Sequence, residues 1–349
     1  MVRLRILVAA LALAVLSGSL GSAQAATPLN LRIGWAVVPG QLTAVLFSRK
    51  DILKHYGKSY TVQTEYFRGS TPQITGLGTG DLDIASLAFS SFGLAIQNAH
   101  MNDLRVVADL YQDGANGHYS SEYMVLANSG INKVEDLKGK VLASNGLGGA
   151  IDMAMRKMMR DHGLEANRDY QIVEIAFPNM MAALDEKKVA LAGLVTPFSV
   201  IAHQSGRYHT LFTVRDAMGP TQLTMFAMRA SFIAAHRPAL VDFFEDVQRA
   251  THWFLDPANR TAAIDIIAKF TKKPASDYSG WLFTKKDYYH DPDARPNLAA
   301  LQKNLDVQKQ LGFLKINIDV KKYADLSLVD DAAKRLHGDG GMVKARNRA

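Results

Sequence analysis

The apolar positions of this chain fall into short blocks whose spacing alternates between strand-like and helix-like. A compact apolar run at 31–35 predicts a buried strand, and a polar loop containing glycine follows it. Apolar residues then recur at helical spacing up to a stop signal at Gly57, so we expect a helix over 42–57. A threonine followed by proline opens a short helix at 72–78, and the next apolar run predicts a strand at 82–87.

The same order of elements returns later in the chain. We expect a strand at 140–143, a loop at 144–149 and a helix at 151–162 that stops at Gly163. The stretch GSTPQITGLGTGDLDIASLAFSS is then matched by NMMAALDEKKVALAGLVTPFS, which begins at Asn179. Each half therefore predicts strand, loop, helix, strand, helix, strand. With right-handed crossovers, each half becomes a parallel sheet with helices on both faces, an α/β fold.

Polar or glycine-rich loops follow the carboxyl ends of the predicted strands in both halves. In open α/β sheets ligands bind beyond these ends, and most of the loops also begin a helix whose free N–H groups favour an anion. Ordinary turn and capping chemistry explains each loop taken alone, but their coincidence in both halves predicts a shared cleft. The loops are Pro39-Gly40-Gln41, Gly69-Ser70-Thr71, Phe89-Ser90-Ser91, Ser144-Asn145-Gly146, Phe177-Pro178-Asn179 and Thr196-Pro197-Phe198.

Two loop-rich segments interrupt this rhythm, each flanked by a strand, at 124–127 and at 224–228. We interpret residues 121–222 as an inserted lobe, and residues 26–120 with 223–340 as one discontinuous lobe. The two crossings would form a hinge that absorbs the torsion change of closure. Its floor would hold Tyr119, Ser120, Glu122 and Gln222.

The remaining segments are a helical C-terminal region and the two ends of the chain. Helices beginning at Pro238, after Asn259 and at Asn297 should pack on the discontinuous lobe, and 341–349 should be a flexible tail. Basic residues, a short apolar stretch and small residues at 1–25 predict a secretory signal that is cleaved after Ala25. A membrane anchor is the alternative, but the apolar stretch is shorter than the roughly 20 residues that a span requires.

Composition narrows the classes of function. The 349 residues contain no cysteine, which excludes disulfides and thiolate metal sites. The formal net charge of +7 is scattered along the chain, so we expect a solvated surface rather than a nucleic-acid interface.

Catalytic motifs are absent from the sequence. The GKS at 57–59 lacks the phosphate-loop glycine, because Ile52 occupies its position, and Gly146, Gly148 and Gly149 do not have dinucleotide-loop spacing. The ten histidines include no H-E-x-x-H pair. We therefore expect no enzyme activity, no cofactor and no metal.

Several stretches resemble the periplasmic substrate-binding proteins of ABC importers in the nitrate, sulfonate and taurine group, whose relatives include binders of thiamin-pyrimidine precursors. They are LRIGW, GSTPQITGLGTGDLDIASLAFSS, VEDLKGKVLASNGLGGAIDMAMRKMM and AALDEKKVALAGLVTPF, with Gly80 to Asp83 and Asp136 to Lys140 as the most specific parts. The resemblance covers essentially the whole chain beyond the signal. It implies a two-lobed periplasmic binding protein of type II, with parallel-rich sheets, which closes over one solute and delivers it to an ABC permease.

The resemblance also implies particular contacts with the solute. They are Pro39, Gly40, Gln41, Gly69, Ser70, Thr71, Phe89, Ser90, Gly146, Gly148, Gly149, Asn179, Thr196, Pro197 and Phe198, to which the strand ends and the hinge add Trp35, Asn145, Tyr119, Glu122 and Gln222. One departure is Ala190, where the family usually has an acidic residue. Arg68 is either a ligand of the anion or a solvent-facing strand residue.

Five aromatic residues, Trp35, Phe89, Tyr119, Phe177 and Phe198, either wall an apolar part of the solute or pack in the core. We expect a small organic anion, a sulfonate or a carboxylate, bound by a monomer in the periplasm. Two alternatives remain open: an enzyme on the same fold in thiamin-pyrimidine or menaquinone biosynthesis, and a solute receptor for a sensor kinase.

Overall fold

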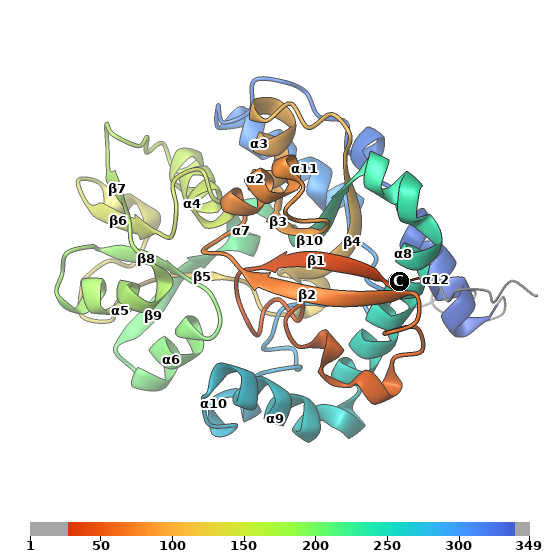
Figure 1. The fold of residues 1–349 in the computed structure, drawn as a ribbon. Coiled ribbons are helices and arrows are strands. Elements are labelled where there is room, and N and C mark those ends of the chain that lie inside the picture. Colours follow the sequence, from red (N-terminus) through yellow and green to blue (C-terminus); the bar gives the residue numbers. More distant parts are fainter. Residues whose placement is uncertain (1–26, 339–349) are drawn as a thin grey trace, which may run out of the picture.

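The computed structural model describes residues 27–338. The predicted signal at 1–25 and the predicted tail at 341–349 lie outside the described residues. The chain forms a mixed α/β fold with two groups of strands, one around β1 to β4 with β10 and one around β5 to β9, as labelled in Figure 1.

The first group contains strands from both ends of the chain. β1 (Leu29–Trp35) pairs in parallel with β2 (Tyr60–Tyr66), and a parallel bridge from Ile33 to Ile84 joins β1 to the segment that leads into β3. A three-stranded sheet has the order β3 (Ala85–Ala88), β10 (Thr221–Arg229), β4 (Leu104–Asp113), with β10 antiparallel to both neighbours. Through the bridge, the strand order is β2-β1-β3-β10-β4, and we call this assembly the first sheet.

The second sheet is built from one continuous stretch of chain. Its five strands have the order β7 (Gln171–Glu174), β6 (Val141–Ser144), β8 (Leu191–Leu194), β5 (Glu122–Leu126), β9 (Tyr208–Thr213). β6 runs parallel to β7 and β8, whereas β5 runs antiparallel to β8 and β9. Both sheets thus contain three parallel strands followed by one antiparallel strand.

The prediction of parallel-rich α/β units joined by two crossing segments is confirmed, but a wholly parallel sheet in each half is wrong. The antiparallel strands, β5 and β10, are the ones through which the chain enters the second sheet and returns from it. Because no helical crossover precedes them, these two strands run opposite to the strands that do follow a crossover. Asp113 pairs with Thr221 and Glu122 pairs with Thr213, so the two crossings lie side by side at both of their ends. The lobe boundaries at 120/121 and 222/223 stay a prediction.

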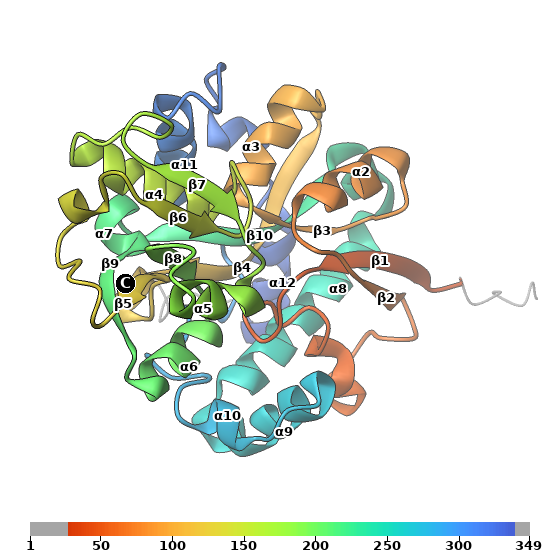
Figure 2. The ribbon, with the colours of Figure 1, turned by 90° about the vertical axis from the view of Figure 1, so that its left-hand side faces the viewer.

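Helices surround both sheets (Figures 1 and 2). Their bounds are α2 (Thr71–Thr79), α3 (Phe89–Asn98), α4 (Ala150–Asp161), α5 (Phe177–Asp185), α6 (Phe198–Ser205), α7 (Val214–Met218), α8 (Ala230–Leu255), α9 (Arg260–Thr271), α10 (Ser276–Ser279), α11 (Leu298–Gln310) and α12 (Ser327–His337). The repeated phrase of the sequence forms α2 with β3 and α5 with β8. The two helices of this pair each carry proline in the first turn.

The helix expected over 42–57 does not form. Two short 3-10 helices, η1 (Leu46–Ser48) and η2 (Lys50–Ile52), occupy this stretch. The backbone N–H groups of Lys54 and His55 donate to the carboxylate of the buried Asp246 on α8, at 2.7 and 2.8 Å. A carboxylate distant in sequence therefore accepts hydrogen bonds that helical carbonyls would otherwise take.

The helix predicted to begin at Pro238 begins earlier, at Ala230. Pro238 lies inside α8, and His236 just before it has the non-helical torsions φ −127° and ψ 17°. Proline has no N–H for the helical ladder and crowds the preceding turn, which explains the kink.

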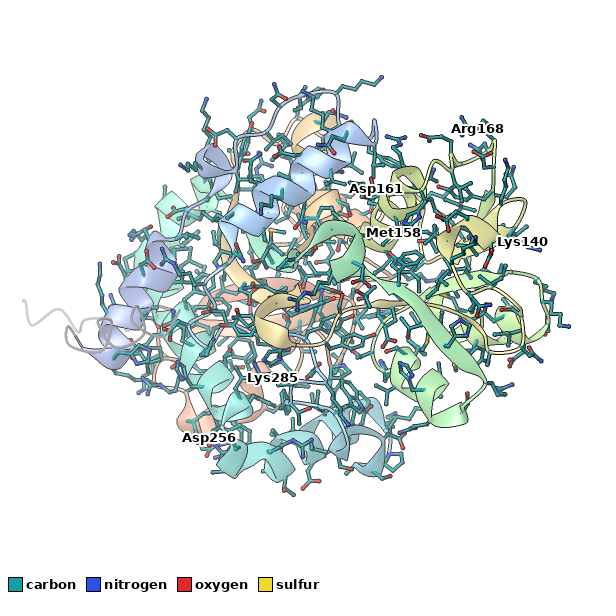
Figure 3. All side chains as sticks on the ribbon, turned by 180° about the vertical axis from the view of Figure 1, so that it is seen from behind. Lys140, Met158, Asp161, Arg168, Asp256 and Lys285 are labelled. Atoms are coloured by element: carbon teal, nitrogen blue, oxygen red, sulfur yellow. The ribbon has the colours of Figure 1, made fainter. Side chains whose placement is uncertain are left out.

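The apolar core has three parts. The largest cluster includes residues of β1, β3, β4, β10 and the C-terminal helices, and two smaller clusters flank the second sheet. α4 of the second group lies against α11, as Figure 3 shows around Met158 and Asp161. Within residues 27–338, every helix is too short or too polar to span a bilayer.

Candidate ligand-binding site

The loop after β1 is shaped by a buried glutamine. The Gln41 side-chain oxygen accepts a hydrogen bond from the Ala36 N–H at 2.8 Å, and the Gln41 backbone N–H donates to the Val37 carbonyl at 2.7 Å. Pro39 and Gly40 are also buried, and a Cβ on Gly40 would lie 3.6 Å from the Tyr111 ring. Pro39, Gly40 and Gln41 therefore form the structure of the loop, and the Gln41 side-chain oxygen already accepts the hydrogen bond from Ala36.

The loop after β2 is fastened to the end of β3. The Ser70 hydroxyl accepts a hydrogen bond from the Ala88 N–H at 2.9 Å, and the Gly69 carbonyl accepts one from the Gln73 amide at 3.2 Å. Thr71 is exposed, with its hydroxyl 3.5 Å from that of Ser91. Arg68 is exposed and forms no ion pair with any residue that the structure describes, so its guanidinium is available to an anion.

The residues at the start of α3 belong to the core. Phe89 is fully buried in the main apolar cluster, which favours the core over the wall of the site, the two interpretations that the sequence left open. Ser90 is 1% exposed, and its carbonyl accepts a hydrogen bond from Gln308 on α11 at 2.9 Å. Both residues sit where the chain packs against α11.

An aromatic cluster occupies the carboxyl ends of β1 and β2. The Trp35 ring lies 5.1 Å from that of Tyr66 and 5.5 Å from that of Phe270, centroid to centroid. Tyr66 is 58% exposed and Phe270 on α9 is 41% exposed. Sequence reasoning found Trp35 but missed the other two, because Phe270 lies far along the chain and Tyr66 belongs to an ordinary strand pattern.

The glycine loop between β6 and α4 satisfies many of its own hydrogen bonds. The N–H of Leu147 donates to Glu174 at 2.6 Å, that of Gly148 to Asp152 at 2.7 Å, and that of Gly149 to the Gly146 carbonyl at 3.1 Å. The backbone N–H groups of Gly148 and Gly149 are therefore occupied in this structure. Burial raises the pKa of Asp152, whose carboxylate also accepts from Arg156 at 2.9 Å.

The same loop touches the C-terminal region. A Cβ on Gly148 would lie 3.4 Å from the ring of Phe313, and the Arg156 guanidinium lies 5.5 Å from the centroid of that ring. The Arg160 guanidinium donates to the Gln310 carbonyl at 2.9 Å. The helices α4 and α11, which accompany the second and the first group of strands respectively, are therefore in direct contact.

Two further predicted segments lie at the amino ends of α5 and α6. Asn179 is exposed, and Pro197 and Phe198 are half-buried; Asn145, in the loop between β6 and α4, is also exposed. The rings of Phe177 and Phe198 are stacked, with centroids 6.2 Å apart and an interplanar angle of 18°. They offer a second aromatic surface beside the carboxyl ends of β7 and β8.

Unpartnered hydroxyls mark the carboxyl ends of two adjacent strands. Ser144 ends β6 and is 0% exposed, and Thr196 follows β8 and is 1% exposed. Both side-chain oxygens lack a hydrogen-bond partner among the described residues, as does that of the buried Thr43 in the loop after β1. A buried polar group without a partner costs about 1–3 kcal/mol, so these oxygens can gain from a polar solute.

Tyr119 joins the crossing segment to α6. Its hydroxyl lies 2.6 Å from that of Ser199, and its ring stands edge-on to that of Tyr288 at 5.1 Å. Burial raises the pKa of Tyr119 well above its ordinary value, so the phenol stays neutral.

The other predicted floor residues bond within their own surroundings. Glu122 accepts from Thr210 and lies 2.7 Å from His203 Nε2. Gln222 donates to Asp109 at 2.6 Å and accepts from the Asn297 N–H at 2.6 Å. These polar atoms already have partners inside the protein, so a contact of Glu122 or Gln222 with the solute stays a prediction.

Asp113 organises the crossing itself. It is fully buried and accepts from the Ser120 hydroxyl and, at 2.9 Å, from the Ser121 N–H. The Ser120 hydroxyl accepts in turn from the Arg215 N–H of the second crossing at 2.9 Å. Burial raises the pKa of Asp113 to about 6.

Two cavities lie away from these strand ends. One of about 350 Å³ is bounded by α11 and residues 316–319, and another of about 20 Å³ lies between Leu42, Asp109, Phe226 and His290. The lining of both cavities contains none of the residues predicted to contact a solute. The position of the solute therefore stays a prediction, supported by the unpartnered hydroxyls and the aromatic surfaces.

Comparisons with known proteins agree on the fold. The model of the NMT1-like family matches residues 24–268. The solved periplasmic aliphatic sulphonate binding protein SsuA of Escherichia coli is similar with a TM-score of 0.65 at 19% identity, over 85% of this chain and 92% of that chain.

Two other solved structures are similar. The alkanesulfonate-binding protein SsuA of Xanthomonas axonopodis pv. citri, bound to MOPS, has a TM-score of 0.67 at 17% identity, over 86% of this chain and 100% of that chain. The periplasmic nitrate-binding protein NrtA of Synechocystis PCC 6803 has a TM-score of 0.69 at 16% identity, over 88% and 89%. Among curated protein sequences, none matches the chain significantly.

Proposed function

This chain belongs to the NMT1-like family, and from that premise we propose that it is a periplasmic solute-binding protein that delivers a small organic anion to an ABC-type permease. The observation that carries the proposal is the pair of buried, unpartnered hydroxyls of Ser144 and Thr196 at the carboxyl ends of β6 and β8. This is the sheet edge where α/β folds bind ligands. The fold shared with sulfonate and nitrate binders supports the same reading.

The chemistry around the strand ends favours an organic acid over an inorganic ion. Hydroxyl groups and the exposed guanidinium of Arg68 suit a sulfonate or carboxylate head. The Trp35, Tyr66 and Phe270 cluster offers apolar surface to an aliphatic or aromatic tail. A small inorganic anion would leave that surface unused.

Binding would act by population shift. Open and closed forms exchange, and a solute that touches both groups of strands favours the closed form. The side-by-side crossings allow this rotation, because a few residues near Asp113 and Thr213 can absorb the torsion change. The protein would work as an exported monomer, without a cofactor.

A thermal-shift panel tests the proposal. The mature protein is heated with alkanesulfonates, arylsulfonates, carboxylates, nitrate and pyrimidines, one compound at a time. A compound at 100 times its dissociation constant should stabilise the fold by about 2.7 kcal/mol. No shift with any compound at millimolar concentration would contradict the proposal.

Thr196→Val sharpens the panel, because valine keeps the shape and removes the hydroxyl. Since that hydroxyl has no partner among residues 27–338, the empty variant should be as stable as the wild type, within about 0.5 kcal/mol. Affinity for the solute should fall about tenfold through loss of one hydrogen bond. Thr75→Val, on the exposed surface of α2, is the matched control and should bind like the wild type.

A further inference from the structure

Three metal-ligating side chains converge in the C-terminal region. His252 lies on α8, Asp293 lies between α10 and α11, and His337 is the last residue of α12. The Nε2 atoms of both histidines lie 2.8 Å from the same oxygen, Oδ1 of Asp293. All three ligand atoms lie within 4.8 Å of one another, and the two imidazole rings are 5.2 Å apart.

This geometry is close to the one that zinc requires. Zn²⁺ binds imidazole nitrogen and carboxylate oxygen at about 2.0–2.2 Å in a tetrahedron, which puts neighbouring ligand atoms about 3.3 Å apart. Each N–O pair here would have to open by only about half an ångström to admit the ion. In their neutral form both rings can present an Nε2 lone pair by carrying the proton on Nδ1.

We propose that His252, Asp293 and His337 form a surface binding site for a divalent transition metal, Zn²⁺ by preference, with water in the remaining position. Imidazole and carboxylate ligands suit zinc, and the chain has no cysteine to offer a softer site.

Two hydrogen bonds hold the backbone of Asp293 in place. Its N–H donates to Asp291 at 3.0 Å, and its carbonyl accepts from the Gln248 amide on α8 at 2.8 Å. Such outer contacts orient ligands in metal sites.

Position and access also suit a cation. His337 ends α12, where the helix dipole favours positive charge. The side chains of His252, Asp293 and His337 are 40%, 31% and 29% exposed, so an ion can reach them from solvent. The nearby guanidinium of Arg295 is engaged by Asp330.

The site is separate from the proposed solute site. It joins α8 to α12, which in Figure 1 lie on the side of the molecule opposite β5 to β9. A bound ion would hold the C-terminal helix against α8, so its expected effect is on stability. The inference does not depend on the solute or on the transport role.

Zinc titration calorimetry tests the site on untagged, EDTA-treated full-length mature protein in a non-coordinating buffer. The wild type should bind one Zn²⁺ per chain and should melt at a higher temperature with ZnCl₂ than without it. His252→Gln and His337→Gln should each bind at least about tenfold more weakly and lose the thermal shift. His162→Gln is the matched control and should behave as the wild type, because the His162 side chain lies on the surface and, within the described part of the chain, pairs only with Glu135.

Equal zinc binding by all four proteins, or no binding by the wild type below about 1 mM, would overturn the proposal, because a three-ligand site should bind more tightly than scattered surface groups. Circular dichroism of the metal-free proteins separates loss of the site from loss of the fold. The two histidines lie on different helices, so a folding defect in one variant leaves the other as the deciding test.

Discussion

Asp109, Asp287 and Asp113 are fully or almost fully buried acids near the crossing segments. Burial raises their pKa values to about 8, about 7 and about 6 respectively. Asp109 accepts hydrogen bonds from the Gln222 amide at 2.6 Å and from the Asp291 N–H at 3.0 Å, but neither donor offsets the lost hydration of the charged form.

Asp109 predicts a specific dependence of stability on pH. The folded protein holds this proton up to about pH 8, whereas an unfolded chain releases it near its ordinary value of 3.8. The folded state therefore binds more protons between these values, and the free energy of unfolding falls as the pH rises from about 4 to about 8. Between pH 6 and pH 8, the free energy of unfolding of Asp109→Asn should fall by up to about 2 kcal/mol less than that of the wild type, as measured by urea denaturation.

The exposed Asp265→Asn on α9 is the control for this measurement. It should keep the wild-type profile, since its carboxylate is solvated in both states. If the free energy of unfolding of Asp109→Asn falls with pH between pH 6 and pH 8 as steeply as that of the wild type, Asp109 is ionised in the native protein.

At the same scale, hydrogen-bond partners distinguish polar side chains that hold the fold together from those whose polar atoms could bind a solute. Gln41, Ser70 and Gln222 were predicted to touch a solute, and each is engaged inside the protein. Thr196 and Ser144 have the same small polar character in sequence, but their hydroxyls have no partner among the residues that the structure describes. A residue type indicates that a hydrogen bond is possible, whereas only the surroundings decide which atom receives it.

At the scale of elements, the packing of α3 on α11 depends on a glycine. A Cβ on Gly93 would lie 2.5 Å from Gln308 Oε1, 3.0 Å from Leu305 and 3.1 Å from Leu314. Gln308 also donates to the Ser90 carbonyl, so it is not free to move away. This contact helps to fix the start of α3 at the end of β3.

Gly93→Ala should therefore destabilise the protein by about 1–3 kcal/mol, because an added methyl group overpacks the helix interface. Chemical denaturation measures the change. Gly280→Ala is the matched control, since a Cβ there meets nothing within 4 Å and the backbone is right-handed helical. The control should change stability by less than about 0.5 kcal/mol, and an equal effect of both substitutions would contradict the packing argument.

At the scale of the whole molecule, the two sheets repeat one strand order and are joined by two paired crossings. α4 and α11 already touch through Arg160 and Gln310. Such an arrangement allows rotation about the crossings without unfolding either sheet.

The absence of cysteine permits a direct measurement of this rotation. Lys58→Cys and Lys188→Cys place one fluorophore on each group of strands, at exposed positions. A compound that raises the melting temperature should change energy transfer between them, because it selects the closed form.

The pair Lys58→Cys and Lys303→Cys is the control for this measurement, because both positions belong to the group around the first sheet. Its energy transfer should stay constant when the compound binds. Binding without any change in the first pair would exclude closure as the mechanism.

The sequence by itself determined the order of elements, their duplication and the places where strands give way to loops. These features depend on local periodicity and turn chemistry, so α2 with β3 and α5 with β8 could be predicted from the repeated phrase alone. The resemblance to binding proteins followed from the same local patterns.

Only the tertiary structure decided the rest, because it depends on residues that are distant in the chain. The carboxylate of Asp246 on α8 accepts backbone hydrogen bonds where the sequence predicted a helix after β1. The antiparallel strand β10 makes the first sheet mixed, and Phe270 on α9 completes the aromatic cluster beside Trp35. The convergence of His252 and His337 on Asp293 likewise has no signature in their spacing. Local propensity selects elements, whereas burial and pairing between distant segments select which side chains meet.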